Sequence, residues 1–272
     1  MPVTSPAYAR LAAVLPELRV TEGEPRSDPG WIGSQQLAAG GAVLDAFIGW
    51  DAEQIVREYG SPPRPDVAAT LGLHRYAWPA CLLFTVPWFL HRRVPRLPVG
   101  DVSFHRESGR MTVRTRSFGC LPDDPAAALP GARVLPTEAA LRDELRAALA
   151  EHLTPVLDAF RPRLRRGPRA LWGMATDEIT EGLWHIGCLM DREERAVADL
   201  TALLPGGTAP YVGGAHFRGT PQIPDMPGAP ESDCTRDRLT CCLFYTVSPD
   251  DACGSCPRGA ESDRNRRRAT AA

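Results

Sequence analysis

Apolar residues recur at helical spacing over much of the N-terminal third of the chain. The pattern predicts a first helix over residues 7–18 and a second over residues 35–59, separated by a polar stretch rich in Gly and Pro. In the second helix the apolar positions fall near one face, and Gly60 is the expected stop. Both segments are therefore expected to pack an apolar face against a core.

A third helix is expected to begin at Asp66, which could act as its cap, and to continue into the apolar window 77–90. Pro79 and Pro87 lie inside this window, so the helix should be bent or divided there. The window is shorter than the roughly 20 residues of a membrane-spanning helix. It is expected to be a buried helix.

The middle of the chain changes to strand-like alternation. Residues 102–105 and 111–118 have strand character, and Glu107-Ser108-Gly109 between them has the composition of a turn, which predicts a β-hairpin. Residues 123–136 are rich in Pro, Ala and Gly and are expected to be a loop.

Helical periodicity returns after the loop. The spacing predicts helices over residues 141–160, 170–189 and 191–204, the last opening with a sequence that resembles a capping box. Residues 208–237 are rich in Pro and Gly, with one short possible strand at residues 215–218. Together the patterns predict a helix-rich α+β fold, in which a helical body carries a small β-hairpin or sheet.

Composition narrows the function classes. The 272 residues are 43% hydrophobic, as in an ordinary globular protein, and the formal charge of −2 gives no field that would recruit nucleic acid. Residues 1–30 show no secretory signal pattern, so a reducing cytoplasmic location is expected, and disulfides are disfavoured. No dinucleotide-binding, Walker or nucleophile-elbow motif is present.

The most informative pattern is a group of four cysteines near the C-terminus, C-C-x(10)-C-x(2)-C, formed by Cys241, Cys242, Cys253 and Cys256. No His lies between the first and the last, which favours a closed all-thiolate site over a catalytic zinc site. Thiolates alone suit either structural zinc or an iron–sulfur cluster.

The spacing favours the larger iron–sulfur centre. The pair Cys253 and Cys256 forms one ordinary metal-binding knuckle, whereas Cys241 and Cys242 are adjacent. Adjacent side chains in a regular strand point to opposite faces, so both could face one centre only where the backbone is irregular. A binuclear cluster accepts neighbouring thiolates more easily than one tetrahedral ion. The pattern also differs from both common ferredoxin spacings.

The run Leu239-Thr240-Cys241-Cys242-Leu243-Phe244-Tyr245, followed by Cys253-Gly254-Ser255-Cys256-Pro257, resembles the C-terminal signature of the FhuF-type ferric-siderophore reductases. The resemblance implies that Cys241, Cys242, Cys253 and Cys256 hold a [2Fe–2S] cluster. It further implies an oxidoreductase that passes one electron to Fe(III) held by a siderophore and releases Fe(II) for iron assimilation.

The resemblance also suggests how the chain is divided. Residues 1–230 would be the helix-rich body with the substrate-binding region, residues 231–258 the cluster-binding segment and residues 259–272 a disordered basic tail. Electrons would come from an external donor such as a ferredoxin or a reductase. The alternatives are a non-catalytic [2Fe–2S] redox or accessory protein of siderophore metabolism and a structural zinc module.

Other candidate residues have simpler explanations. Cys81 and Cys188 lie in apolar helical patterns and are expected in the core, and Cys120 has no partner by spacing. Cys234 could replace a cluster ligand but is interpreted as a bystander. The lone His185 and His216 are not assigned as ligands.

Two surface features have both a functional and a structural interpretation. A dense positive region could attract an anionic ferric chelate, although a solvated face is the favoured interpretation. It is formed by Arg92, Arg93, Arg96, Arg114 and Arg116. Phe244 and Tyr245 could shield the cluster, and ordinary packing explains them equally well.

Overall fold

The computed structural model describes residues 3–207, 209–219, 234–248 and 257 of the 272-residue chain. The helices within these residues are α1 (Ser5–Val14), α2 (Ser34–Ala38), α3 (Gly41–Tyr59), α4 (Pro65–His91), α5 (Glu138–Leu164), α6 (Pro168–Leu189) and α7 (Glu193–Leu203). The strands are short and form small sheets. The fold is helix-rich α+β, as predicted.

The strands of the described residues form three sheets. The first has the order β1-β5-β4-β2 and consists of β1 (Arg19–Glu22), β2 (Trp31–Gly33), β4 (Val102–His105) and β5 (Arg110–Val113). The second has the order β3-β6-β7 and consists of β3 (Val94–Arg96), β6 (Ser117–Cys120) and β7 (Ala132–Val134). The third is the antiparallel pair β8 (His216–Gly219) and β9 (Cys234–Asp237).

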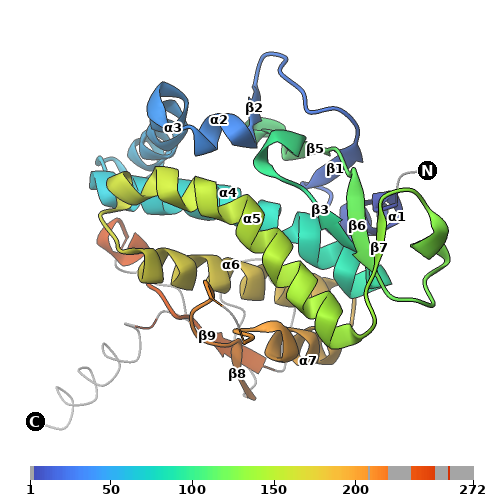
Figure 1. Cartoon of the computed structure of the whole chain (residues 1–272). Helices are drawn as coiled ribbons and strands as arrows, with labels where there is room; N and C mark the ends of the chain where they lie inside the picture. The colour runs from blue at the N-terminus through green and yellow to red at the C-terminus, as the bar shows by residue number, and fades with distance from the viewer. Residues whose placement is uncertain (1–2, 208, 220–233, 249–256, 258–272) are drawn as a thin grey trace, which may run out of the picture.

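Helix α4 runs through the middle of the fold, and α5 and α6 pack along it (Figure 1). Helices α1 and α3 also contact it, while the first two sheets lie toward one end of the helical layers. Every residue from 81 to 89 is buried, so this part of α4 has no solvent face. The prediction of a buried helix is confirmed, because a helix that is apolar all round must be covered on all sides.

Helix α4 is not divided at its prolines. It continues through Pro79, which is half-buried, and through Pro87, which is buried. Asp66 is not the cap: the helix begins at Pro65, with Arg64 as the N-terminal flanking residue, and Asp66 lies in the first turn. The helix ends at His91, where Arg92 adopts a left-handed conformation with φ of 52°.

Both predicted N-terminal helices differ from the structure, the first in its end and the second in its continuity. Helix α1 stops at Val14 because Pro16 disfavours a helical conformation for Leu15. The predicted single helix over residues 35–59 is two helices, since Gly40 and Gly41 have φ values of 73° and 64° and break the hydrogen-bonded path. The expected stop at Gly60 is confirmed by its φ of 74°.

The predicted hairpin is the pair β4–β5, with Val102 opposite Val113 and His105 opposite Arg110. Its second strand is shorter than predicted, because β5 ends at Val113 and residues 117–120 join a different sheet as β6. The predicted loop 123–136 contains the edge strand β7. Strands β1, β2, β3 and β9 were not predicted, since three or four residues are too few for a recognisable alternation.

The later helices lie where the periodicity places them. Helix α5 begins after Thr137, whose hydroxyl accepts a hydrogen bond from the N–H of Ala140 at 3.1 Å. The capping box expected at Asp191 is wrong. Asp191 has a φ of 56° in the turn after α6, where the N–H of Arg192 donates to the carbonyl of Gly187 at 2.7 Å, and α7 begins only at Glu193.

No helix in the described part of the chain carries an apolar stretch long enough to cross a lipid bilayer.

His152 is a buried titratable group between α4 and α5. Its Nδ1 lies 2.7 Å from the carbonyl oxygen of Leu97, and its Nε2 lies 2.8 Å from the hydroxyl of Tyr76. A carbonyl oxygen can only accept, so Nδ1 donates, and Nε2 of the neutral ring accepts from the tyrosine hydroxyl. Burial lowers the pKa of His152 to about 4.

The lowered pKa predicts a loss of stability in mild acid. The unfolded chain takes up this proton near pH 6.5 and the folded chain only near about 4, so stability is lost as the pH falls through that interval. Between pH of about 7.5 and 5 the linkage amounts to about 2 kcal/mol of unfolding free energy. Urea unfolding at both pH values should show a weaker pH effect for His152→Gln than for the wild type. Equal pH effects in the two proteins would contradict the assignment.

Candidate metal centre

Cys241 and Cys242 lie in an irregular stretch between β9 and the short 3-10 helix η4 (Phe244–Thr246). The predicted irregular backbone is confirmed: Leu243 has a φ of 67°, in the left-handed region. Its backbone N–H donates toward the Sγ of Cys241, with an N–S distance of 3.4 Å. Hydrogen bonds to cysteine sulfur are among the contacts that tune iron–sulfur centres.

The structure places two of the four predicted ligands. Cys253 and Cys256 lie outside the described residues, so the joint geometry of the four thiols stays a prediction. Cys234 is described by its backbone alone, which pairs with Gly219 at the end of β9.

The carboxylate of Asp177 on α6 holds the backbone that leads into the two cysteines. Its Oδ1 accepts from the N–H of Leu239 at 2.8 Å, and its Oδ2 accepts from the N–H and the hydroxyl of Thr240 at 2.9 and 2.7 Å. Arg236 adds an ion pair at 3.3 Å. The Asp177 side chain is only 2% exposed, so these donors replace the water that a buried carboxylate loses.

A second layer of charges surrounds this contact. Glu181, one turn further along α6, forms an ion pair with Arg236. Glu178 lies 2.6 Å from Nδ1 of His74 and 3.7 Å from Arg238. The negative charge of Glu178 raises the pKa of His74. Burial acts to raise the pKa of Glu181, but its arginine neighbours hold it below the ordinary value.

Two glycines let the segment approach the body closely. A Cβ at Gly173 of α6 would lie 2.8 Å from the methyl group of Thr240, and one at Gly213 would lie 2.7 Å from the Leu239 side chain. Gly213 also has a φ of 71°, which favours glycine. Any larger residue at these positions would push the cysteine segment away from α6.

In addition to Asp177, two other side chains contact the cysteine segment. The guanidinium of Arg166, in the connection between α5 and α6, donates to the carbonyl oxygen of Cys241 at 3.0 Å. The ring of Phe244 meets the ring of Tyr59 edge-on, with centroids 5.6 Å apart. The Cys241–Cys242 stretch is therefore attached to the ends of α3 and α5 and to the middle of α6.

The described residues fit an iron–sulfur cluster in three respects. Two of the predicted ligands, Cys241 and Cys242, lie on irregular backbone, an N–H donor reaches the sulfur of Cys241, and cationic side chains lie nearby. Within the described residues, no group of three or more His, Cys, Asp or Glu side chains is arranged to hold a metal ion.

The other predicted candidates lie on other elements of the fold. Cys81 and Cys120 are buried, and burial raises the pKa of both thiols, as expected for core cysteines. Cys188 is half-buried rather than fully in the core. His185 packs edge-on against Trp78 at 6.0 Å, and His216 is exposed on β8.

The predicted positive region is largely neutralised by ion pairs. Arg92 contacts Glu138 and Asp199, and Arg93 contacts Asp124. The remaining pairs are Arg96 with Glu144 and Glu151, Arg114 with Glu24 and Asp101, and Arg116 with Asp101. These contacts favour the structural interpretation of the region.

Sequence reasoning missed the residues that hold the segment, above all Asp177, Arg236 and Arg166. One signal was present: Asp177, Glu178 and Glu181 interrupt an apolar helix, and acidic side chains are almost never fully buried without a partner. The partners could not be found from the sequence, because they lie about 60 residues further along the chain.

The arrangement fits an iron–sulfur type of site, and a comparison with known families makes the assignment more specific. Residues 238–258 match the family model described as the FhuF 2Fe-2S C-terminal domain. The match spans all four predicted ligands, supports the FhuF-type resemblance and assigns a [2Fe–2S] cofactor rather than zinc. It supports an iron–sulfur, siderophore-related role. No curated protein matches the chain.

Removal of the Asp177 carboxylate should weaken cluster retention more than it disturbs the helical body. Asp177→Ala leaves two backbone N–H groups without their acceptor and removes one of the two carboxylates that pair with Arg236, whereas Asp177→Asn keeps one oxygen acceptor. We expect the Ala variant to retain less than about half of the wild-type iron and sulfide after anaerobic gel filtration, with the Asn variant in between. We also expect the electron paramagnetic resonance signal of the reduced cluster that remains in Asp177→Ala to differ from that of the wild type.

The control for this experiment is Asp143→Ala, which removes an exposed carboxylate that pairs with Arg146 on the same helix, α5. Far-ultraviolet circular dichroism reports on the body of all three variants. Full cluster content and an unchanged spectrum in Asp177→Ala would show that this carboxylate does not position the ligands.

Proposed function

We propose that the protein is a ferric-siderophore reductase in which Cys241, Cys242, Cys253 and Cys256 hold a [2Fe–2S] cluster. Residues 231–258 form the cluster-binding segment and residues 1–230 the body that receives the chelate. The observation that carries the proposal is the FhuF-type cysteine segment, which is fastened to the body by the buried carboxylate of Asp177.

The bound cluster supplies the chemistry, the transfer of single electrons. The balance of the reaction is simple: an external donor loses one electron, and Fe(III) in the chelate gains it and becomes Fe(II). Hard oxygen ligands bind Fe(II) much more weakly than Fe(III), so the metal is released. The donor would be a ferredoxin or a reductase, because the sequence has no dinucleotide-binding motif.

The residues of the chain would hold the ligands and control their surroundings. The N–H of Leu243 stabilises negative charge on the Sγ of Cys241, and the irregular backbone there would allow the neighbouring thiols to face one centre. Arg166 fixes the carbonyl of Cys241, so the ligand geometry does not have to reorganise when charge changes. The rings of Tyr59 and Phe244 supply an apolar contact beside this stretch.

Single cysteine substitutions test the ligand assignment. Cys241→Ser, Cys242→Ser, Cys253→Ser and Cys256→Ser should each lose most of the visible charge-transfer absorption and most of the bound sulfide, because serine oxygen is a poor replacement for thiolate at iron. Cys188→Ser is the matched control, since Cys188 is a half-buried cysteine on α6 outside the motif. If one motif variant keeps a normal cluster, Cys234→Ser in the same background identifies the replacement ligand.

A single-turnover experiment tests the reductase function. Protein is reduced under anaerobic conditions, freed of excess reductant and mixed with a ferric siderophore and a ferrous iron trap. About one Fe(II) per cluster should appear while the cluster reoxidises. An intact cluster that stays reduced in the presence of several ferric chelates would instead identify a non-catalytic redox protein.

A further inference from the structure

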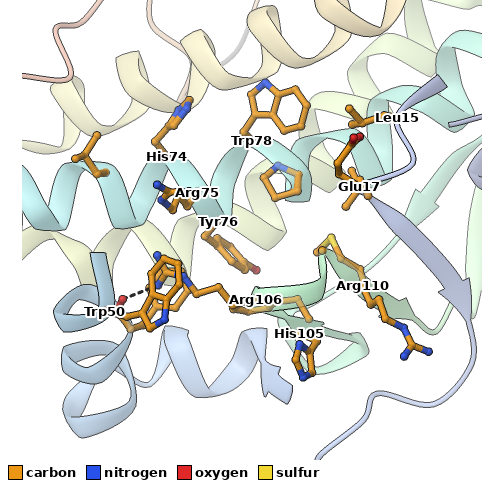
Figure 2. A pocket seen from close by; sticks show the side chains of 17 residues that line it. Leu15, Glu17, Trp50, His74, Arg75, Tyr76, Trp78, His105, Arg106 and Arg110 are labelled. Carbon is orange, nitrogen blue, oxygen red and sulfur yellow. Dashed lines mark hydrogen bonds between the residues drawn. The ribbon is translucent and has the colours of Figure 1, made fainter. Parts of the chain in front are cut away.

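A cavity of about 460 Å³ lies between α4, the end of α1, and the β4–β5 hairpin of the first sheet. Figure 2 shows its wall, with His74, Tyr76 and Trp78 of α4 on one side and His105 and Arg106 on the other. A volume of this size is within the range of small-molecule sites. The proposed function has so far used none of these residues.

The wall combines aromatic and cationic side chains. Trp50, Trp78 and Tyr76 contribute aromatic surface, and Arg75, Arg106 and Arg110 contribute positive charge. Glu17 is the one carboxylate among the residues that line the cavity, and Figure 2 shows it across the cavity from Trp50 and Arg106. The side near Trp50 therefore carries a local excess of positive charge.

Arg106 is a fixed cation in this wall. Its guanidinium lies 4.1 Å from the ring centre of Phe47 and 4.0 Å from that of Trp50, and it donates to the carbonyl oxygen of Phe47 at 2.6 Å. It also pairs with the buried carboxylate of Asp51, and its side chain is 12% exposed. Contacts with two rings hold the guanidinium in place, so a ligand would not have to order it.

Arg75 and Arg110 are the exposed arginines among the residues that line the cavity. The Arg75 side chain is 55% exposed and lies 2.7 Å from Asp51, which it shares with Arg106. Arg110 is exposed on β5 and forms no ion pair with the residues that the structure describes. The guanidinium of Arg75 lies 5.9 Å from the ring centre of Trp50, and a cation next to indole surface suits an anionic ligand with flat arms.

A chain of three side chains connects the cavity wall to the cysteine segment. His74 lies in the cavity wall, and its Nδ1 contacts Glu178 of α6 at 2.6 Å. Glu178 also contacts Arg238 at 3.7 Å, three residues before Cys241. These contacts link the cavity wall to the backbone that leads into Cys241, so a ligand in the cavity would be coupled to the segment proposed to carry the cluster.

We propose that this cavity binds the ferric chelate and that it favours an anionic chelate with aryl donor arms, the tris-catecholate class. The proposal rests on the reductase function and adds a substrate class and a binding site to it. The fixed Arg106 and the exposed Arg75 and Arg110 recognise the negative charge of the chelate. The rings of Trp50 and Trp78 face its flat arms.

Gallium(III) chelates test the site because they bind like the ferric complexes but cannot be reduced. Calorimetric titration of the full-length, cluster-loaded protein would compare a trianionic gallium tris-catecholate with a neutral gallium tris-hydroxamate. In Arg75→Gln/Arg110→Gln the dissociation constant of the tris-catecholate should rise by about ten- to a hundredfold, with a weaker dependence on salt. The control Arg10→Gln/Arg57→Gln removes two exposed arginines that do not line the cavity and should bind as the wild type does.

A second variant, Leu71→Trp, adds volume at a half-buried wall position and should exclude both chelates. Wild-type affinity in this variant and in Arg75→Gln/Arg110→Gln would overturn the site. If the wild type binds the neutral tris-hydroxamate more tightly, and only Leu71→Trp abolishes that binding, the cavity does not select an anionic chelate.

Reduction of the corresponding iron chelates separates this proposal from the proposed function. If both cavity variants reduce the iron chelates with an unchanged KM, the reductase function is supported and chelate binding in the cavity is refuted. Gallium binding that follows the expected pattern, without any reduction of the iron chelates by the wild type, would keep the cavity and refute the reductase.

Discussion

The geometry around the cysteines depends on one buried carboxylate. Asp177 accepts hydrogen bonds from two consecutive backbone N–H groups and one hydroxyl of residues 239–240, and it is 2% exposed. A buried charge without these donors would cost several kcal/mol, so the carboxylate and the segment stabilise each other or neither is stable in this arrangement. This mutual dependence places Cys241 next to the body even though residues 239–243 form no regular element.

Helix α4 joins this site to the rest of the molecule. Its residues 81–89 are buried on all sides and leave no freedom to shift, while its preceding turns line the cavity with His74, Tyr76 and Trp78. The same turns face α6, so the wall of the cavity and the support of the cysteine segment belong to two helices in direct contact. In a close-packed core, a displacement of α4 requires repacking of α6, so the positions of the two helices are coupled.

The sequence predicts those features that local chemistry determines and misses those that depend on distant partners. The helical periodicity locates α5 and α6, and the cysteine spacing predicts both the irregular backbone at Cys241 and the cofactor of the family match. The Gly40-Gly41 break between α2 and α3 was missed, because two glycines do not reveal their φ values in advance. The three-residue strands and the contact between Asp177 and residues 239–240 depend on tertiary pairing, which local patterns do not encode.

The arginines of this chain illustrate why composition alone could not locate a substrate surface. Where Arg92, Arg93 and Arg96 cluster in the sequence, the fold places carboxylates against each of them, and the cluster becomes part of the framework. Arg75 and Arg106 are far apart in the sequence, yet they share the single carboxylate of Asp51. Two cations on one anion leave positive charge unbalanced at the cavity wall. A recognition site for anions is defined by the balance of charges after folding, and the density of arginine along the chain does not measure that balance.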